Sequence, residues 1–495
     1  MKNSYSVIGL ALLLALVVVG AVGAQSAASV PGGGWWSGEM IQNVGAANAA
    51  LVVTAYDASS SATYEVSDTL TPSEARNFIP SDFVGMPSGF GGSAIVSSDQ
   101  PIKAIVNVTN RQSGDLGVLG GQAAAQYQGI DGAAVAGTLY FPMAKNDRYG
   151  KTTSFYIQNA GATAATAQCV FTMDNGSTYP FTTASIGAGQ MVVVTPADAG
   201  VPSDGANRNN IGSLKVSSSV DLAGVVMEYK TGESPATLLQ GTRGFTSNDF
   251  DTVLYAPTVK QDRFGRFTGI QVQNVESSAS VDVTVRLVGA RGDCAGSTYV
   301  RTYLNLAAGA SKTFNQIAGQ DGAMIDNCAA SATIEATGNV VAVVSESYVA
   351  GKIPAGQNQA STTYSAFPQA LASAAIGVPM FKENRFSKYT GLMIQNVSST
   401  TANNVVVTLV GAAGTAAGST YTTVPMAIAP GASLELSKLS ENAAIWTGST
   451  APSNSTYGVK IVADQNIVAI ANEAVYPGAA FQQDKNNYEG FNLAP

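Results

Sequence analysis

The chain contains no histidine among its 495 residues. This absence excludes catalytic triads that use histidine, histidine acid–base catalysis and histidine metal sites. Charged residues are also scarce, at 12% of the chain, against roughly 25% in an average globular protein. Because exposed helices usually carry charge on their outer faces, this scarcity favours strands and turns, and we expect an all-β fold.

Basic residues form no stripe or cluster, and the formal net charge is −8. Proteins that neutralise nucleic-acid phosphates need clustered Lys and Arg, so the sequence predicts no nucleic-acid partner. An apolar run over 7–22 ends in small residues, which predicts a signal peptide over 1–24 with cleavage after Ala24. A retained membrane anchor stays open, because the run is near the lower length limit for a span. With cleavage, we expect a secreted chain, extracellular or associated with the cell surface, with no membrane span.

A tripeptide of one apolar residue followed by Gln-Asn recurs four times. Its Gln residues lie 116, 115 and 122 positions apart, a regularity that indicates internal repeats. After the signal peptide we place four modules, at 25–130, 131–247, 248–372 and 373–495. The signature residues, which we predict to be structural, are Gln42, Asn43, Gln158, Asn159, Gln273, Asn274, Gln395 and Asn396.

A second motif, Pro-x-x-Lys-x-x-Arg-aromatic, precedes the signature in the last three repeats. The first repeat begins where this segment should stand, so we expect its first strand to be incomplete. The basic residues of the motif, also predicted to be structural, are Lys145, Arg148, Lys260, Arg263, Lys382 and Arg385.

Alternating apolar residues and Gly-containing turns divide each repeat into roughly six to eight short strands. Near the end of each repeat, a polar cluster separates two apolar alternations and predicts a closing hairpin. The four hairpins are expected at 94–106, 214–226, 332–344 and 459–471. The sequence therefore predicts four tandem antiparallel β-sandwich modules.

In these repeats the chain resembles the tandem immunoglobulin-like β-sandwich proteins of bacterial exported surfaces, of the surface-layer, sheath or adhesin type. The resemblance is at the level of this class and covers the whole chain after the signal peptide. It implies a role as a stalk, lattice or filament, and it carries over no catalytic, cofactor or metal residues. We therefore expect a protein that is not an enzyme and has no cofactor.

Three carboxylates occupy the same strand position in the last three repeats: Glu228, Glu346 and Glu473. Glycoside hydrolysis needs only two positioned carboxyl groups, so it stays open in principle. A residue repeated in module after module is better explained as a structural partner of the repeated Lys and Arg.

Two of the three cysteines, Cys294 and Cys328, lie in one repeat. The next repeat has Ala416 in place of Cys294 and no cysteine near the second position. This joint absence predicts a disulfide, which an oxidising compartment permits. The third, Cys169, stands in an apolar run and is expected in a core.

Besides a glycoside hydrolase, which stays open in principle, the sequence leaves two candidate functions. The first is a secreted, non-catalytic structural protein of the cell surface, a surface-layer, sheath or filament subunit that associates with itself or with other surface proteins. The second is an adhesin or carbohydrate-binding protein with surface glycans as its ligands. The incomplete first repeat suggests completion by another chain, and a frayed N-terminus on a monomer is the alternative.

Overall fold

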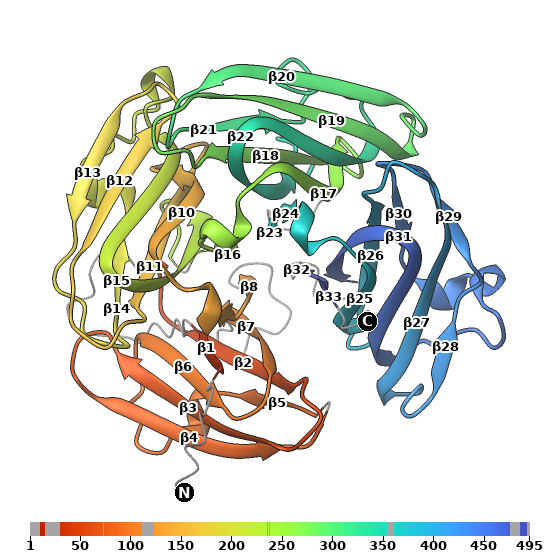
Figure 1. The fold of residues 1–495 in the computed structure, drawn as a ribbon, viewed down its shortest axis with the longest axis horizontal. Helices are drawn as coiled ribbons and strands as arrows, with labels where there is room; N and C mark the ends of the chain where they lie inside the picture. The colour runs from red at the N-terminus through yellow and green to blue at the C-terminus, as the bar shows by residue number, and fades with distance from the viewer. Residues whose placement is uncertain are drawn as a thin grey trace, which may run out of the picture. The chain divides into compact units, whose positions relative to one another are not determined.

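The computed structural model describes residues 10–14, 30–72, 74–110, 123–234, 236, 238–353, 361–475 and 486–492. It forms two compact units. Unit 1 comprises residues 1–115 and 121–248, and unit 2 comprises residues 116–120 and 249–495. Both units are built from antiparallel strands (Figure 1), so the predicted all-β class is confirmed. The four module boundaries stay a prediction.

In unit 1, the first repeat forms two sheets with strand orders β4-β3-β6-β1-β9 and β5-β2-β7-β8. Strand β3 alternates buried and exposed residues, as expected for a strand with one face on a core. The strands are β1 Leu10–Leu14, β2 Trp35–Asn43, β3 Ala49–Asp57, β4 Thr63–Leu70, β5 Ala75–Phe78, β6 Gly92–Ser98, β7 Ile102–Asn110, β8 Ala124–Gln128 and β9 Ile130–Asp131.

The second repeat, also in unit 1, forms a sheet of order β13-β12-β15-β11-β14, with β10 and β16 also paired to β15. Its strands are β10 Ala136–Lys145, β11 Lys151–Asn159, β12 Ala167–Met173, β13 Thr178–Thr182, β14 Met191–Val194, β15 Ile211–Lys230 and β16 Leu239–Arg243.

Unit 2 repeats this plan twice. In the third repeat the order is β20-β19-β22-β17-β24, and in the fourth it is β28-β27-β31-β25-β33. The strands are β17 Asp251–Gln261, β18 Arg266–Asn274, β19 Val281–Gly292, β20 Thr298–Leu306, β21 Ser311–Asn315, β22 Cys328–Tyr348, β23 Thr362–Ser365, β24 Phe367–Pro368, β25 Ser373–Glu383, β26 Lys388–Asn396, β27 Ala402–Gly414, β28 Thr420–Thr422, β29 Met426–Ile428, β30 Ser433–Leu436, β31 Ser455–Val475, β32 Asn486–Glu489 and β33 Phe491–Asn492.

Helical structure among the described residues is limited to short 3-10 turns. None of them is long and apolar enough to cross a membrane. They are η1 Pro80–Asp82, η2 Gly132–Ala134, η3 Pro196–Ala199, η4 Ala206–Arg208, η5 Ser247–Asp249, η6 Gln369–Leu371, η7 Leu439–Glu441 and η8 Ala443–Ile445.

The predicted closing hairpins are wrong. In the last three repeats each is one long strand, β15, β22 or β31, whose two halves pair with different strands. The first half of β15 pairs with β12, and its second half pairs with β11. In the first repeat, β6 and β7 lie in separate sheets. The polar cluster marks the point where the chain passes from one sheet of a sandwich to the other, rather than a reverse turn.

Adjacent repeats within a unit share buried contacts. In unit 1, Ser93 Oγ donates to the carbonyl oxygen of Gly189 at 2.6 Å. In unit 2, Ser331 Oγ donates to the carbonyl oxygen of Gly431 at the same distance, 2.6 Å. Gly189 has φ 75°, and a Cβ there would lie 2.5 Å from the ring of Tyr56, so this close approach requires glycine. The same contact therefore joins the first repeat to the second and the third to the fourth.

The predicted signal peptide lies outside the described residues, except for Leu10–Leu14. These five residues form β1, which pairs with β6 and β9 of the first repeat. Cleavage after Ala24 stays a prediction.

Candidate functional site

The Asn of the tripeptide signature makes the same three hydrogen bonds in every repeat. In the second repeat, Asn159 Nδ2 donates to the carbonyl oxygens of Thr163 and Ile186 at 2.8 Å, and its Oδ1 accepts from the N–H of Gly161. The side chain thus joins the loop after its own strand to a second, more distant turn. Asn43, Asn274 and Asn396 make the equivalent bonds.

The Gln of the signature binds a glycine carbonyl at the turn beside it. Gln158 Nε2 donates to Gly189 at 2.9 Å, Gln273 to Gly309 at 3.2 Å and Gln395 to Gly431 at 3.3 Å. Gly189 and Gly431 are the residues at the contacts between repeats. In the second and fourth repeats, the signature therefore stabilises both the repeat and its junction with the preceding one.

A buried carboxylate with two cations occupies the same place in the last three repeats. In the second repeat, Glu228 is fully buried and pairs with Lys145 and, at 3.2 Å, with Lys151. Gln240 Nε2 donates to its Oε1 at 2.6 Å. The other two clusters are Glu346 with Lys260 and Arg266 at 2.6 and 3.2 Å, and Glu473 with Lys382 and Lys388 at 2.6 and 2.8 Å.

Sequence reasoning placed both the Lys and the Arg of the second motif beside these carboxylates. The structure brings the lysines there but not Arg148, Arg263 and Arg385. The second cation is instead Lys151, Arg266 or Lys388, each three residues after the motif Arg. A basic residue at this constant spacing was a visible signal that the sequence analysis did not use.

The buried glutamates of the second and fourth repeats are held in their ionised form by the cations beside them. Burial alone raises the pKa of Glu228, but Lys145 and Lys151 outweigh it and hold the pKa at about 2. In the fourth repeat, Lys388 and Lys382 likewise overcome burial and lower the pKa of Glu473. A carboxyl group that is ionised at neutral pH holds no proton to donate, so Glu228 is unsuited to general acid catalysis.

Each cluster also fixes the strand that carries its lysine. The backbone N–H of Lys145 donates to Thr153 Oγ1 at 2.9 Å. The same bond joins Lys260 to Thr268 at 3.0 Å and Lys382 to Thr390 at 2.9 Å.

The motif Arg and the aromatic residue after it form an exposed turn next to each cluster. The guanidinium carbon of Arg148 lies 4.3 Å from the ring centroid of Tyr149, and the equivalent distances for Arg263 with Phe264 and Arg385 with Phe386 are 4.4 and 4.7 Å. The three rings are 65%, 72% and 74% exposed. Their residues have φ of 54°, 55° and 53°, a conformation that is rare for bulky side chains and common at functional sites. We call these three pairs the aromatic turns.

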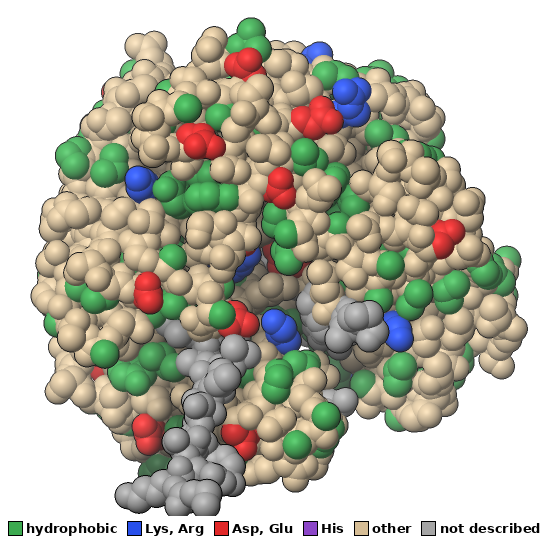
Figure 2. All heavy atoms as spheres, in the orientation of Figure 1, with side chains coloured by type: hydrophobic (Ala, Val, Ile, Leu, Met, Phe, Trp, Pro, Cys, Tyr) green, Lys and Arg blue, Asp and Glu red, His purple; other side chains and the backbone are tan. Residues whose placement is uncertain are grey.

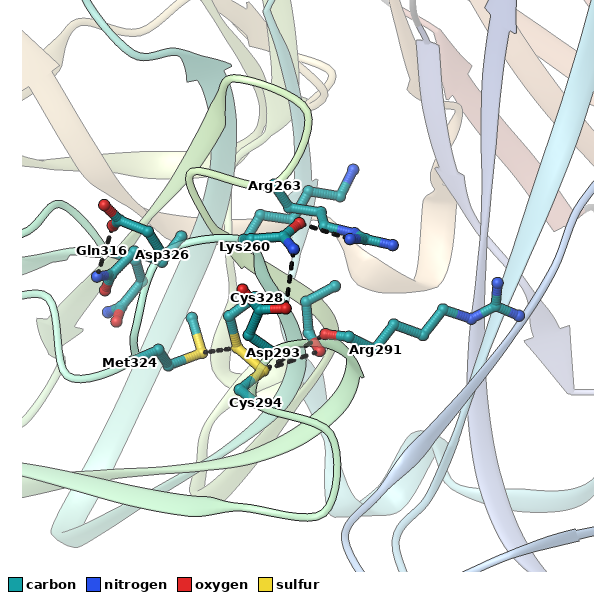
Figure 3. Close-up of a disulfide and its surroundings, with 12 residues drawn as sticks. Lys260, Arg263, Arg291, Asp293, Cys294, Gln316, Met324, Asp326 and Cys328 are labelled. Carbon is teal, nitrogen blue, oxygen red and sulfur yellow. Dashed lines mark hydrogen bonds between the residues drawn. A yellow bond between two sulfur atoms is a disulfide. The ribbon is translucent and has the colours of Figure 1, made fainter.

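A disulfide joins Cys294, after β19, to Cys328, at the start of β22, with Cα atoms 5.4 Å apart. Figure 3 shows Met324 beside it, with its Sδ 3.2 Å from Cys328 Sγ. In the fourth repeat the same corner holds Ala416 and Ser455, where Ser455 Oγ accepts from the N–H of Ala416 at 3.0 Å. The third cysteine, Cys169, is buried, and burial raises its pKa to about 12.

Replacing Cys294 and Cys328 together by alanine is expected to lower the free energy of unfolding of unit 2 by about 3 kcal/mol, because the closed loop no longer restricts the unfolded chain. Calorimetry of the double variant measures the change, and Cys169→Ala serves as the unpaired control. An unchanged transition in the double variant would mean that the bridge contributes no stability.

No group of three His, Cys, Asp or Glu side chains suited to a metal ion occurs among the residues that the structure describes. On the face drawn in Figure 2, the charged side chains of those residues are scattered and form no large patch of one sign.

No protein family model and no curated protein matches the chain. Among solved structures, 22% of the chain is similar to Thermotoga maritima 1070, with 18% identity and a TM-score of 0.18 over 93% of that chain. A tetra-tandem repeat in the extending region of a large adhesion protein is similar over 92% of this chain and 94% of its own, with 13% identity and a TM-score of 0.11. Trypsin-activated alpha-2-macroglobulin from Escherichia coli is similar over 97% of this chain and 41% of its own, with 11% identity and a TM-score of 0.11. Likenesses this weak assign neither a family nor a function.

Proposed function

We propose that the protein is a secreted, non-catalytic structural subunit of a cell-surface assembly. The observation that carries the proposal is the recurrence of the aromatic turns: one exposed ring, covered on one side by its Arg, at the same place in three repeats. Exposed aromatic residues and Arg are enriched in protein interfaces. Repetition of one such element along a chain suits contacts that recur in a lattice or filament.

The cluster under each aromatic turn supports this role. Lys145, Lys260 and Lys382 hold the strand that leads into the turn, so each ring is presented on a fixed backbone. In unit 2, the contact of Ser331 with Gly431 joins the third and fourth repeats and so holds their two aromatic turns at one spacing. A rigid turn loses less conformational entropy when it docks against a partner.

Export is supported by the apolar N-terminal run and by the Cys294–Cys328 bridge, because disulfides persist in oxidising compartments outside the cytoplasm. Binding to surface glycans is the second candidate. Its usual platform is an exposed Trp, but Trp35 and Trp446 are 3% and 6% exposed and Trp36 is half-buried.

Replacing Phe264 and Phe386 by serine is expected to abolish assembly while leaving the chain folded and exported, since neither ring is part of a core. Electron microscopy of cells carrying the double variant, with an antibody against the protein, measures this. Val84→Ser is the matched control, because Val84 is 92% exposed and lies outside the aromatic turns. Assemblies of normal appearance in the double variant would contradict the proposal.

A further inference from the structure

In the second, third and fourth repeats, a lead-in strand (β10, β17 or β25) fills the same place in the sandwich. On one side it pairs with the long strand, through Leu139 with Val216, Leu254 with Ile334, and Ile376 with Ile461. On the other side it pairs with the segment that leaves the repeat, through Tyr140 with Phe245, Tyr255 with Phe367, and Gly377 with Phe491. A lead-in strand is therefore an interior part of its sheet.

In the first repeat this place is taken by the leader residues of β1. Leu12 pairs with Val96 of β6, and Leu13 pairs with Ile130 of β9. We call the place between Ala94–Ser98 and Ile130–Asp131 the β6–β9 slot.

The strand in the β6–β9 slot, β1, is separated from the signature Gln of its repeat by more residues than the other lead-in strands are. Phe141, Ala256 and Val378 hold one register position and lie 17 residues before the signature Gln of their repeats, whereas Leu14, at the same position, lies 28 residues before Gln42. The residue 17 positions before Gln42 is Gln25, the first residue after the predicted cleavage site. Cleavage therefore removes β1. The sequence that it leaves at this register, Gln-Ser-Ala-Ala-Ser over 25–29, has neither the apolar pair nor the Lys of the other lead-in strands.

Two buried hydroxyl groups of the first repeat lack the partner that a lead-in strand supplies elsewhere. Ser37, which is fully buried, corresponds to Thr153, whose Oγ1 accepts from the backbone of Lys145. Tyr127, at 4% exposure, corresponds to Tyr364, whose hydroxyl donates to the carbonyl oxygen of Thr258 in β17 at 2.7 Å. Neither Ser37 Oγ nor Tyr127 Oη has a hydrogen-bond partner among the described residues. Such orphaned groups are costly in a folded protein, and they mark contacts still to be made.

A buried carboxyl group faces the same place. Glu39 is 1% exposed, and neither of its carboxyl oxygens has a hydrogen-bond partner in the described part of the chain. It corresponds to Phe155, whose ring packs edge-on against that of Phe141 in the lead-in strand at 5.1 Å. The side chain at this position is therefore directed toward the lead-in strand.

We propose that, in the exported protein, the β6–β9 slot receives a strand from another polypeptide. This strand has the pattern shared by the chain's own lead-in strands: two apolar residues two positions apart, and a Lys four positions after the second. Its backbone binds Ser37 and Tyr127, and its Lys pairs with Glu39. The lead-in strands of the other three repeats occupy their own sheets, so the donor is a strand of a partner protein.

The Lys that we expect in the donor strand is inferred from the position of the Glu39 carboxyl group. In the second repeat the carboxylate stands on the long strand, at Glu228, and the lead-in Lys145 pairs with it. In the first repeat Val108 replaces this Glu, and the carboxyl group stands instead on the neighbouring strand at Glu39. Ser37 pairs with Val108 and Glu39 with Val106, so the two carboxyl positions lie on neighbouring strands, offset by two residues, on the same face of the sheet. A flexible Lys side chain spans that distance.

The probe is a fluorescent decapeptide with the sequence of Ala136–Lys145, which is the chain's own lead-in strand. We expect it to bind the exported, processed protein, saturating at one peptide for each chain, as measured by fluorescence anisotropy. Replacing Leu139 and Phe141 of the peptide by Asp is expected to abolish binding. Replacing its Lys145 by Glu, or Ser37 and Tyr127 of the protein by Ala and Phe, is expected to weaken binding by about tenfold or more. Val84→Ser is the control that should bind normally.

Because the processed chain without a lead-in strand can fail to fold in isolation, a second format uses the full chain with a protease site at Ala24–Gln25. The chain is folded first and then cleaved, and the peptide displaces the leader. Failure of the peptide to bind either form, with circular dichroism showing intact strands, would overturn the proposal. So would mass spectrometry showing that the native protein keeps residues 1–24.

This proposal rests on export, which the proposed function also requires. Failure of the strand-binding proposal can be distinguished from failure of the proposed function, because peptide binding is measured in solution and does not depend on whether the native protein assembles.

Discussion

Replacing Glu228 by alanine is expected to lower the free energy of unfolding of unit 1 by about 3 to 5 kcal/mol, because the change leaves Lys145 and Lys151 buried without a counter-ion. The cost should appear in calorimetry as a fall of about 10 °C in the transition of that unit. Glu65→Ala is the matched control, since Glu65 is exposed, and it should change the free energy by less than about 0.5 kcal/mol.

A triple variant separates the cost of an unpaired charge from loss of packing. Lys145→Met, Lys151→Met and Glu228→Leu together replace the cluster by apolar side chains, and the stability should return close to that of the unchanged protein. The first repeat already shows this exchange, with Trp35 at the position of Lys151 and Val108 at that of Glu228. A triple variant as unstable as Glu228→Ala would contradict the account.

The same carboxylate gives unit 1 an acid-sensitive component of stability. The pKa of Glu228 is about 2 in the folded protein and 4.5 in its ordinary range. The folded chain therefore binds fewer protons than the unfolded chain between these values. The contribution, on the order of 3 kcal/mol, is present above pH 4.5 and is lost as the pH falls toward 2.

Glu39→Leu is the second change with a large expected effect. The pH dependence of stability that Glu39 causes is opposite in sign to that of Glu228. Burial raises the pKa of Glu39 from 4.5 to about 8, so the folded chain binds more protons than the unfolded chain between these values. Unit 1 should therefore lose stability on the order of 4 to 5 kcal/mol as the pH rises from 4.5 to 8, while the leucine variant should lose far less. Leucine fits this place, because Phe155, Ile270 and Leu392 stand there in the other repeats.

Urea unfolding at several values between pH 5 and 8, without added peptide, measures this difference. Glu65→Leu, an exposed glutamate in the same unit, controls for the loss of one charge. Equal pH slopes for the unchanged protein and for Glu39→Leu would show that Glu39 is already paired. The slope should also flatten when the decapeptide occupies the slot, because its Lys stabilises the ionised carboxylate.

The all-β class could be predicted because strand alternation and turn residues are local signals. Alternation in β3 and β19 follows directly from one buried face. The hairpins could not be predicted correctly, since a polar cluster between two apolar runs looks the same at a reverse turn and at a crossing between sheets. Only the partners of the two halves of β15 distinguish these cases, and they lie far away in sequence.

The candidate site, too, has features that could be predicted from the sequence and features that could not. The repeated Glu and Lys were visible as constant spacings, but the choice between Arg148 and Lys151 as the second partner depends on which side of the strand each faces. Glu39 was hidden in a strand that otherwise resembles its counterparts, although comparison with Phe155 would have revealed it. A place for Leu10–Leu14 in a sheet could not be predicted while those residues were assigned to a leader.

Labelling intact cells with a gold-conjugated antibody against the protein tests the central claim most directly. A structural subunit of the surface predicts gold particles outside the cytoplasmic membrane, in a continuous layer or along filaments. Particles confined to the cytoplasm, or protein released to the medium only as monomers, would contradict it.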